Sequence, residues 1–247
     1  MCYKKTIFTL SLIAIPLVAC LAQSDSYAIY RAYIEKDMES WRQVIDRRRN
    51  IENPSKEYME ETINYEYGFV AWCLADLGKT RDLAQEYLDY AVEDLELYED
   101  MDSCRESRVM AYRSAFIAYE MKLHPMRTPF IGVKSVKLSR EAVQADSTDY
   151  FAYIQRGNVL YYLPALFGGS KKTAIETYKQ ARDIMQSGFD SKARHNWLYL
   201  NLWLTIADAC KGLRDYAQVK TCYDSVLKIA PDFDWVRDDL YGNLPSE

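Results

Sequence analysis

Glycine, proline and histidine are scarce in this chain, which has 9 glycines, 7 prolines and 2 histidines among 247 residues. Few helix-breaking residues leave room for long uninterrupted helices. The two histidines, His124 and His195, stand apart and form no HExxH pair or other metal-ligand spacing. A serine-elbow motif is also missing from the sequence. We therefore expect no catalytic site, no metal site and no cofactor.

The chain also lacks an excess of positive charge, since 31 lysines and arginines face 36 acidic residues, giving a net charge of −5. Nucleic-acid binding depends mainly on Lys and Arg, so this class of partner is not expected. The Arg47-Arg48-Arg49 cluster is interpreted as a solvated helix end, where cations suit the helix dipole. Glu60-Glu61 and the acidic stretch 93–102 are interpreted as solvated helix faces.

The six cysteines include no CxxC pair, so neither a zinc site nor a redox motif is indicated. Cys73, Cys210 and Cys222 fall within helical patterns, where a buried free thiol is the common case. One alternative stays open, a disulfide between Cys210 and Cys222 across a single helical hairpin.

Residues 1–19 have the pattern of a signal peptide. Lys4 and Lys5 precede an uncharged, apolar run from Thr6 to Val18, which is shorter than the roughly 20 residues that span a bilayer. The run ends in Leu17-Val18-Ala19-Cys20, which resembles the lipobox of bacterial lipoproteins. The alternative is an ordinary secretory signal that is cut near Ala19 or Ala22.

The lipobox resemblance implies that the chain is cut before Cys20 and that this cysteine carries the lipid. Residues 1–19 are then the signal peptide, 20–25 a short tether and 26–247 the folded domain. Two or three acyl chains give stable anchoring where one chain does not. We expect a lipid-anchored protein of the bacterial cell envelope, on the outer membrane and facing the periplasm.

Apolar residues recur at helical spacing through the rest of the chain, and no strand pattern interrupts them. Breakers such as Asn53-Pro54, His124-Pro125 and Gly168-Gly169 divide this region into segments. The predicted helices are 26–49, 55–77, 81–99, 103–123, 130–145, 149–163, 171–186, 191–212 and 215–229. The sequence therefore predicts an all-α fold, either an α-solenoid or a bundle.

The clearest repeat unit runs from Leu202 to Pro231 and resembles a tetratricopeptide repeat. Trp203 stands at the early aromatic position and Ala207 at the small position where the two helices cross. Tyr216 begins the second helix, Tyr223 and Leu227 are its inward residues, and Pro231 ends it. Val219 and Val226 depart from the pattern, because alanines are usual there, and this implies slightly wider helix packing.

Three earlier units are aligned on the small residues Gly68, Ala115 and Gly157. Tetratricopeptide repeats are about 34 residues long, whereas armadillo and HEAT units run to about 40–47. The spacing here is closer to the second class, but the residue pattern favours tetratricopeptide repeats with long turns. We predict an α-solenoid of about four tetratricopeptide-like hairpins with an N-terminal capping helix over 26–49 and a C-terminal cap over 233–242.

First helices of successive units line a concave groove in the tetratricopeptide family. The alignment places these residues in it: Tyr65, Phe69, Trp72, Tyr112, Phe116, Tyr119, Ile154, Asn158, Tyr161, Leu204, Asp208 and Lys211, with Tyr162 beside them. Tyr and Trp dominate many binding surfaces. The alternative is that the aromatic rows are core. Partial exposure of Trp72 favours a binding surface, and complete burial of Tyr65, Trp72 and Tyr119 contradicts it.

The Gly168-Gly169-Ser170-Lys171-Lys172 turn opens a predicted helix, where anions can bind. It lacks the glycine spacing and preceding strand of a phosphate loop, so Ser170 is interpreted as a helix N-cap.

Two functions fit the sequence. The first is a membrane-anchored periplasmic adaptor or scaffold that binds a protein partner through the groove. The second is a small-ligand-binding accessory lipoprotein, similar to those of TRAP-type or glycan uptake systems. An open, shallow groove favours the adaptor, and a deep pocket favours the ligand-binding protein.

Overall fold

The computed structural model describes residues 14–188 and 195–245, with side chains from Asp25 onward. Within these ranges the chain forms helices and no β-strand. The α-helices are α1 (Ala14–Glu35), α2 (Met38–Arg49), α3 (Lys56–Cys73), α4 (Leu77–Glu99), α5 (Glu106–Leu123), α6 (Thr128–Ala145), α7 (Tyr150–Tyr162), α8 (Lys171–Ser187), α9 (Trp197–Lys211) and α10 (Tyr216–Ile229). Shorter helical turns are η1 (Leu74–Asp76), η2 (Pro125–Arg127), η3 (Ala165–Phe167) and η5 (Trp235–Leu240). Residues 1–13 and the side chain of Cys20 lie outside the described part.

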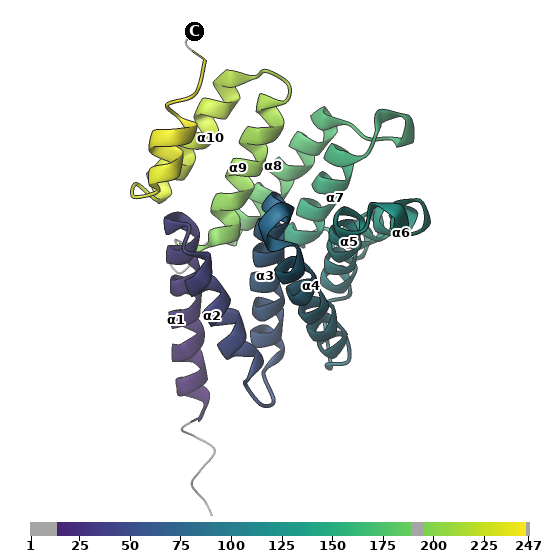
Figure 1. The fold of residues 1–247 in the computed structure, drawn as a ribbon, viewed down its shortest axis with the longest axis vertical. Coiled ribbons are helices and arrows are strands. Elements are labelled where there is room, and N and C mark those ends of the chain that lie inside the picture. Colours follow the sequence, from purple (N-terminus) through teal and green to yellow (C-terminus); the bar gives the residue numbers. More distant parts are fainter. Residues whose placement is uncertain (1–13, 189–194, 246–247) are drawn as a thin grey trace, which may run out of the picture.

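Four helical hairpins, α3–α4, α5–α6, α7–α8 and α9–α10, stack one after another, and α1 and α2 precede them (Figure 1). This confirms the predicted all-α solenoid of four hairpins. No helix among the described residues combines the length and hydrophobicity that crossing a bilayer requires. Ser170 caps α8 as predicted, because its Oγ accepts a hydrogen bond of 3.2 Å from the Thr173 backbone N–H.

The single capping helix predicted over 26–49 is wrong, since two helices occupy this region. Lys36 adopts a positive φ of 59°, which ends α1, and Asp37 starts α2 by accepting the Ser40 backbone N–H at 3.0 Å. The apolar spacing continues through this break and therefore hides it. Asp25, the last residue of the predicted tether, is 2% exposed and pairs with Arg48 at 3.0 Å.

The small residues that align the repeats lie at close helix contacts. A Cβ on Gly157 of α7 would lie 2.4 Å from Cε1 of Tyr178 on α8. A Cβ on Gly68 would lie 2.6 Å from the Trp197 ring and 2.7 Å from the Trp41 ring. Ala207 is buried as well. These positions therefore have no room for a larger side chain.

We expect Gly157→Leu and Ala207→Leu each to lower the midpoint of thermal unfolding by several degrees, since overpacking costs about 1–3 kcal/mol. Glu176→Gln on the exposed face of α8 is the control, because surface changes usually stay within about 0.5 kcal/mol. Thermal unfolding followed by circular dichroism checks this. Equal midpoints for the three variants would mean that the repeat alignment is misplaced.

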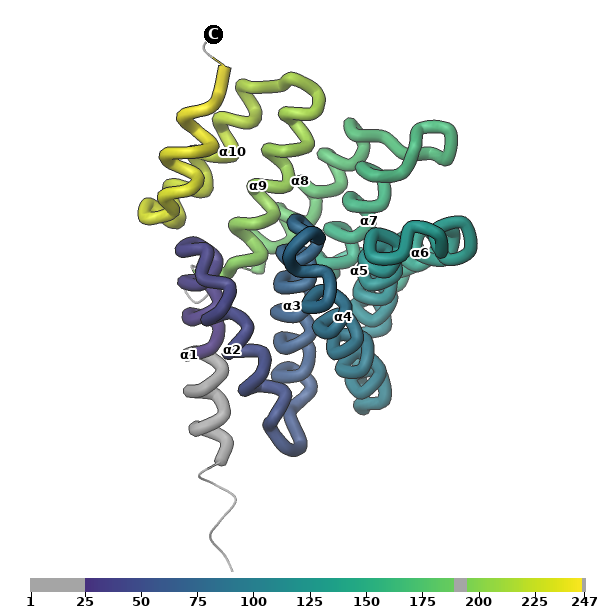
Figure 2. The backbone as a smooth tube through the Cα atoms, in the orientation of Figure 1, coloured from purple at the N-terminus to yellow at the C-terminus, as the bar shows by residue number. Residues whose placement is uncertain are grey.

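The stack curls until its two ends meet. Trp197 of α9 donates a hydrogen bond of 3.0 Å to Asn64 Oδ1 on α3, and its ring lies 4.9 Å from that of Trp41 on α2. Tyr33 of α1 donates to Asn201 of α9 at 3.1 Å. Figures 1 and 2 show α1 and α3 beside the C-terminal helices. The N-terminal helices therefore pack directly against α9.

The Arg47-Arg48-Arg49 cluster is not the solvated helix end that the sequence suggests. Arg48 is 2% exposed, pairs with Asp25 at 3.0 Å and lies 3.7 Å above the Tyr58 ring. Arg49 contacts two carboxylates on different helices, Glu66 at 3.3 Å and Asp94 at 3.4 Å. The acidic stretch 93–102 likewise includes the buried Asp94, so part of it faces the core.

Burial and the neighbouring Asp94 raise the pKa of the Glu66 carboxyl well above its usual range. Because the pKa of Glu66 is higher in the folded than in the unfolded state, the free energy of unfolding decreases as the pH rises. This decrease begins near the unfolded pKa of about 4.3 and continues toward the folded pKa. Glu66→Gln keeps the shape and removes the titration. We expect the melting point of this variant, relative to that of the native protein, to be higher at pH 8 than at pH 5. A constant difference across this range would contradict the assignment.

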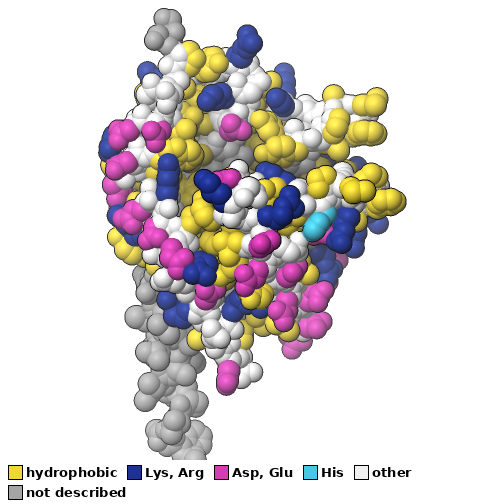
Figure 3. Space-filling view, viewed as in Figure 1, with side chains coloured by type: hydrophobic (Ala, Val, Ile, Leu, Met, Phe, Trp, Pro, Cys, Tyr) yellow, Lys and Arg dark blue, Asp and Glu magenta, His cyan; other side chains and the backbone are white. Residues whose placement is uncertain are grey.

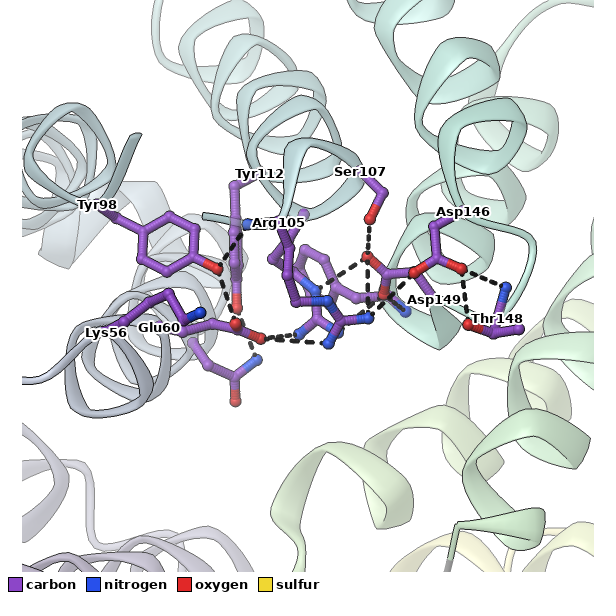
Figure 4. Close-up of polar contacts among 12 residues, drawn as sticks. Lys56, Glu60, Tyr98, Arg105, Ser107, Tyr112, Asp146, Thr148 and Asp149 are labelled. Atoms are coloured by element: carbon purple, nitrogen blue, oxygen red, sulfur yellow. Dashed lines mark hydrogen bonds and ion pairs between the residues drawn. The ribbon is translucent and has the colours of Figure 1, made fainter. Parts of the chain in front are cut away.

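A second charged network joins α3, α5 and the start of α7 (Figure 4). Arg108 is 2% exposed and Asp149 is fully buried. The Arg108 guanidinium donates to both carboxylate oxygens of Asp149, at 2.8 and 3.2 Å, and pairs with Glu60 at 2.7 Å. Asp149 also accepts from Ser107 Oγ at 2.8 Å and from the Phe151 backbone N–H at 2.9 Å. Although burial opposes it, Arg108 lowers the pKa of Asp149.

Candidate functional site

The candidate site is a cavity of about 960 Å³ between the inner surfaces of the second and third hairpins. The first hairpin contributes Tyr67, Ala71 and Leu74, and α8 and α9 contribute Tyr178, Thr205 and Asp208. Most of the wall comes from α5, α6 and α7: Ser114, Ala115, Ala118, Tyr119, Met121, Lys122, Thr128, Pro129, Gly132, Val133, Ser135, Val136, Gln155, Asn158, Val159, Tyr161 and Tyr162, followed by Leu163, Pro164 and Phe167.

Small residues on facing helices leave this space open. Ala115 and Ala118 on α5 face the cavity together with Gly132 on α6. The two helices are held together by reciprocal hydrogen bonds, because Ser114 Oγ donates to the Ser135 carbonyl and Ser135 Oγ donates to the Ser114 carbonyl, both at 2.9 Å. The cavity is therefore built into a fixed helix pair.

Tyrosine rings form one side of the cavity. Tyr67 and Tyr119 are stacked, with ring centroids 5.5 Å apart and planes 18° apart, and Tyr119 donates to the Tyr67 carbonyl at 3.3 Å. Desolvation raises the pKa of the hydroxyls of Tyr119 and Tyr178 well above the usual value. These hydroxyls therefore stay protonated at neutral pH, and the wall that they form is uncharged.

A short chain of polar groups crosses the floor of the cavity. Tyr178 donates to Asn158 Oδ1 at 2.8 Å, and Asn158 Nδ2 donates to Gln155 Oε1 at 3.0 Å. Gln155 is 3% exposed, and its Nε2 has no hydrogen-bond partner within the described part of the chain. Most of these polar groups bond to one another, and among the described residues the Gln155 amide nitrogen is left as a free donor.

Two exposed charged residues, Lys122 and Asp208, line the cavity at its rim. Burial raises the pKa of the Tyr161 hydroxyl, and the nearby Asp208 carboxylate adds to the shift. Lys171 lies 5.5 Å above the Tyr161 ring. Among the described residues, no group of three or more His, Cys, Asp or Glu side chains is arranged to hold a metal ion.

The cavity reaches the surface between two apolar projections. Figure 3 shows hydrophobic side chains that project over the η3 turn and over the α6 region. Three of these side chains also line the cavity and are 70–78% exposed. They are Val133 on one side and Tyr162 and Phe167 on the other.

The structure brings only some of the predicted groove residues together. Tyr119, Asn158 and Tyr161 line the cavity, and Asp208 and Tyr162 do so as well. Four of the aromatic residues lie in the core instead, at 0–4% exposure: Tyr65, Phe69, Tyr112 and Phe116. They do not form a solvent-facing wall, because the curled stack packs neighbouring hairpins against them. The rings of Tyr112 and Phe151 from adjacent hairpins, for example, are 4.2 Å apart.

Trp72 is 43% exposed, but it lies away from the cavity lining and packs on Phe69, with ring centroids 5.7 Å apart. Cys73, Cys210 and Cys222 are buried free thiols, so the disulfide between Cys210 and Cys222 is not formed. Burial raises the pKa of Cys222 to about 12 and that of Cys210 to about 11. Cys210 and Cys222 are therefore protonated thiols at neutral pH.

Sequence reasoning missed the contribution of α6. Thr128, Pro129, Gly132, Val133 and Val136 line the cavity although α6 is the second helix of its hairpin. One signal was available, since three apolar residues, Met126, Phe130 and Val133, recur at helical spacing beside basic residues only.

Neither a scan against family models nor a search of curated proteins finds a match to this chain. Among solved structures, the HusA haemophore from Porphyromonas gingivalis is similar at 16% sequence identity and a TM-score of 0.46. The similarity covers 70% of this chain and 90% of the haemophore chain.

Proposed function

We propose that this protein binds a predominantly apolar small molecule in the cavity between α5, α6 and α7. The observation that supports the proposal is the cavity itself, which measures about 960 Å³ and is lined mostly by aliphatic and aromatic side chains. Ligand sites typically measure about 300–1,000 Å³ and combine an apolar wall with a few polar groups. This cavity has both properties.

The composition of the wall also narrows the class of ligand. A glycan carries many hydroxyl groups, and each would need a hydrogen-bond partner in place of water. The Tyr178–Asn158–Gln155 chain is internally bonded except for Gln155 Nε2, and Lys122 and Asp208 lie at the rim. The cavity is therefore better suited to an aromatic or aliphatic molecule with few polar groups than to a sugar.

The adaptor proposal has less support from the geometry. It depends on an aromatic wall along the inner side of the solenoid, and Tyr65, Phe69, Tyr112 and Phe116 are buried there. The space that remains is concentrated between the second and third hairpins, and the first and fourth hairpins add only a few residues to its wall. A local, half-open cavity of about 960 Å³ is large enough for a small molecule.

We further propose that Cys20 holds the domain on the bacterial envelope, as its lipobox-like context implies. In this arrangement the protein would act as a membrane-tethered ligand carrier or receptor. An acyl mass on the N-terminal peptide of the protein isolated from its native cells would support the anchor, and an unmodified cysteine there would contradict it.

Ligand binding can be tested with N-phenyl-1-naphthylamine, a neutral aromatic probe whose fluorescence rises in apolar surroundings. We expect saturable binding of one probe per chain. A non-fluorescent aliphatic or aromatic competitor should displace the probe, and a disaccharide should not. Linear, non-saturable fluorescence would contradict the proposal, and displacement by the sugar would contradict the apolar ligand class.

A further inference from the structure

The most exposed large apolar side chains of the described residues lie around the mouth of the cavity. Six large apolar side chains are at least 70% exposed, and all of them belong to two segments: Met126, Phe130 and Val133 on η2 and α6, and Tyr162, Leu166 and Phe167 on and beside η3. We call these segments the two lips. Monomeric proteins rarely leave such apolar clusters uncovered unless the cluster contacts a partner or a membrane.

Charge around the lips is mainly positive, in contrast to the chain as a whole. Residues 121–140 contain five basic and no acidic residues, and residues 162–172 contain two lysines and no acid. The whole chain carries a net charge of −5. Positive charge is therefore gathered where the hydrophobic side chains protrude.

Most of this charge is available to a partner. Arg127 pairs with Glu120, and Lys137 pairs with Glu141 at 3.7 Å. The other five basic residues of these two segments form no ion pair among the described residues: Lys122, Lys134, Arg140, Lys171 and Lys172. Asp208 is the acidic residue that lines the cavity rim.

We propose that the two lips dock the mouth of the cavity on an anionic lipid surface. Exposed Phe, Met, Leu and Tyr side chains flanked by lysines are the combination that inserts into the interface of a bilayer with acidic headgroups. The apolar side chains enter the boundary between headgroups and acyl chains, while the lysines contact lipid phosphates. The cavity then opens directly onto the membrane. This surface interaction does not depend on the cavity having a ligand.

Met126 provides a local readout, because its thioether is 90% exposed and can be oxidised by peroxide. The full-length protein, as isolated from its native cells, is mixed with vesicles of phosphatidylglycerol and phosphatidylcholine or with vesicles of phosphatidylcholine alone. Peptide mass spectrometry follows the oxidation of Met126, with the half-buried Met38 as internal reference. Because the readout is local, membrane attachment through the N-terminus does not mimic it.

We expect anionic vesicles to slow the oxidation of Met126 severalfold relative to Met38, and neutral vesicles to leave it unchanged. Half-maximal protection of Met126 is reached at a certain concentration of anionic lipid. Lys134→Gln and Lys172→Gln should each raise this concentration about fivefold. Phe130→Ser should raise it about tenfold or more. The controls are Lys228→Gln on α10 and Leu97→Ser on α4, which remove exposed residues away from the lips.

Three outcomes would overturn the proposal. Oxidation of Met126 at the same rate with and without anionic vesicles means that the lips do not touch lipid. Equal protection by neutral and anionic vesicles means that the lysines have no role. Protection that appears without vesicles and increases with protein concentration means that a second copy of the chain covers the lips.

Discussion

Arg108→Met should destabilise the protein by about 3–5 kcal/mol, which is the usual cost of breaking a buried ion pair from one side. The substitution leaves the Asp149 carboxylate buried with its main counter-charge removed, and it deprives Glu60 of its 2.7 Å partner. Asp149 also caps α7 through the Phe151 backbone N–H, so its displacement weakens the start of that helix. Arg108 connects the first three hairpins through Glu60 and Asp149, and the substitution removes this connection.

The matched control is Arg113→Met on the same helix. Arg113 pairs with Glu99 at the surface, and exposed pairs contribute only about 0–1 kcal/mol. For a chain of this size we expect the melting point to fall by about 6–20 °C for Arg108→Met and by a few degrees at most for Arg113→Met. Similar losses for the two variants would show that the buried network does not hold the hairpins together.

Ala118→Trp should remove ligand binding while leaving the fold intact. Ala118 lies on the α5 side of the cavity and is half-buried, so a tryptophan side chain there extends into open space and not into packed core. It occupies the volume that the ligand needs. We expect the affinity for N-phenyl-1-naphthylamine to fall by about 30-fold or more, the scale of a binding hot spot.

Ala217→Trp on the exposed start of α10 is the control, because it adds the same side chain outside the cavity. Its probe affinity should match that of the native protein. The melting points of both variants should stay close to the native value. Unchanged probe affinity in Ala118→Trp would place the binding site elsewhere, and a large loss of stability would show that the cavity closes in solution.

The sequence predicted the helices and their order well because each hairpin has strong local signals. Apolar spacing, the Ser170 cap and the small residues Gly157 and Ala207 act within one or two turns of helix. The break at Lys36-Asp37 escaped prediction because the hydrophobic pattern continues across it. A single residue with positive φ can end a helix without altering that pattern.

The site was harder to predict than the fold, because burial of the aromatic rows depends on how tightly the solenoid curls. Repeat alignment gives the inner face of each helix, but it does not show whether neighbouring hairpins cover that face. Tyr112 and Tyr119 lie two turns apart on α5, yet the first is fully buried and the second lines the cavity. Contacts such as Trp197 with Asn64, 133 residues apart, decide the difference.

Buried charges were missed for the same reason. Arg48 and Arg108 sit in sequence contexts typical of solvated helix surfaces, and their partners Asp25 and Asp149 lie 23 and 41 residues away. A charged residue is rarely buried unless it is paired, so composition alone favours the solvated interpretation.

Native mass spectrometry of the protein isolated from its own membranes is the direct test of ligand binding in the cavity. We expect a non-covalent small molecule at one copy per chain, which is extracted by organic solvent, partitions as an apolar compound and is missing from Ala118→Trp. Native protein that carries no small molecule and gains none from a total lipid and metabolite extract, while Ala118→Trp behaves identically, would contradict the proposed ligand-binding function.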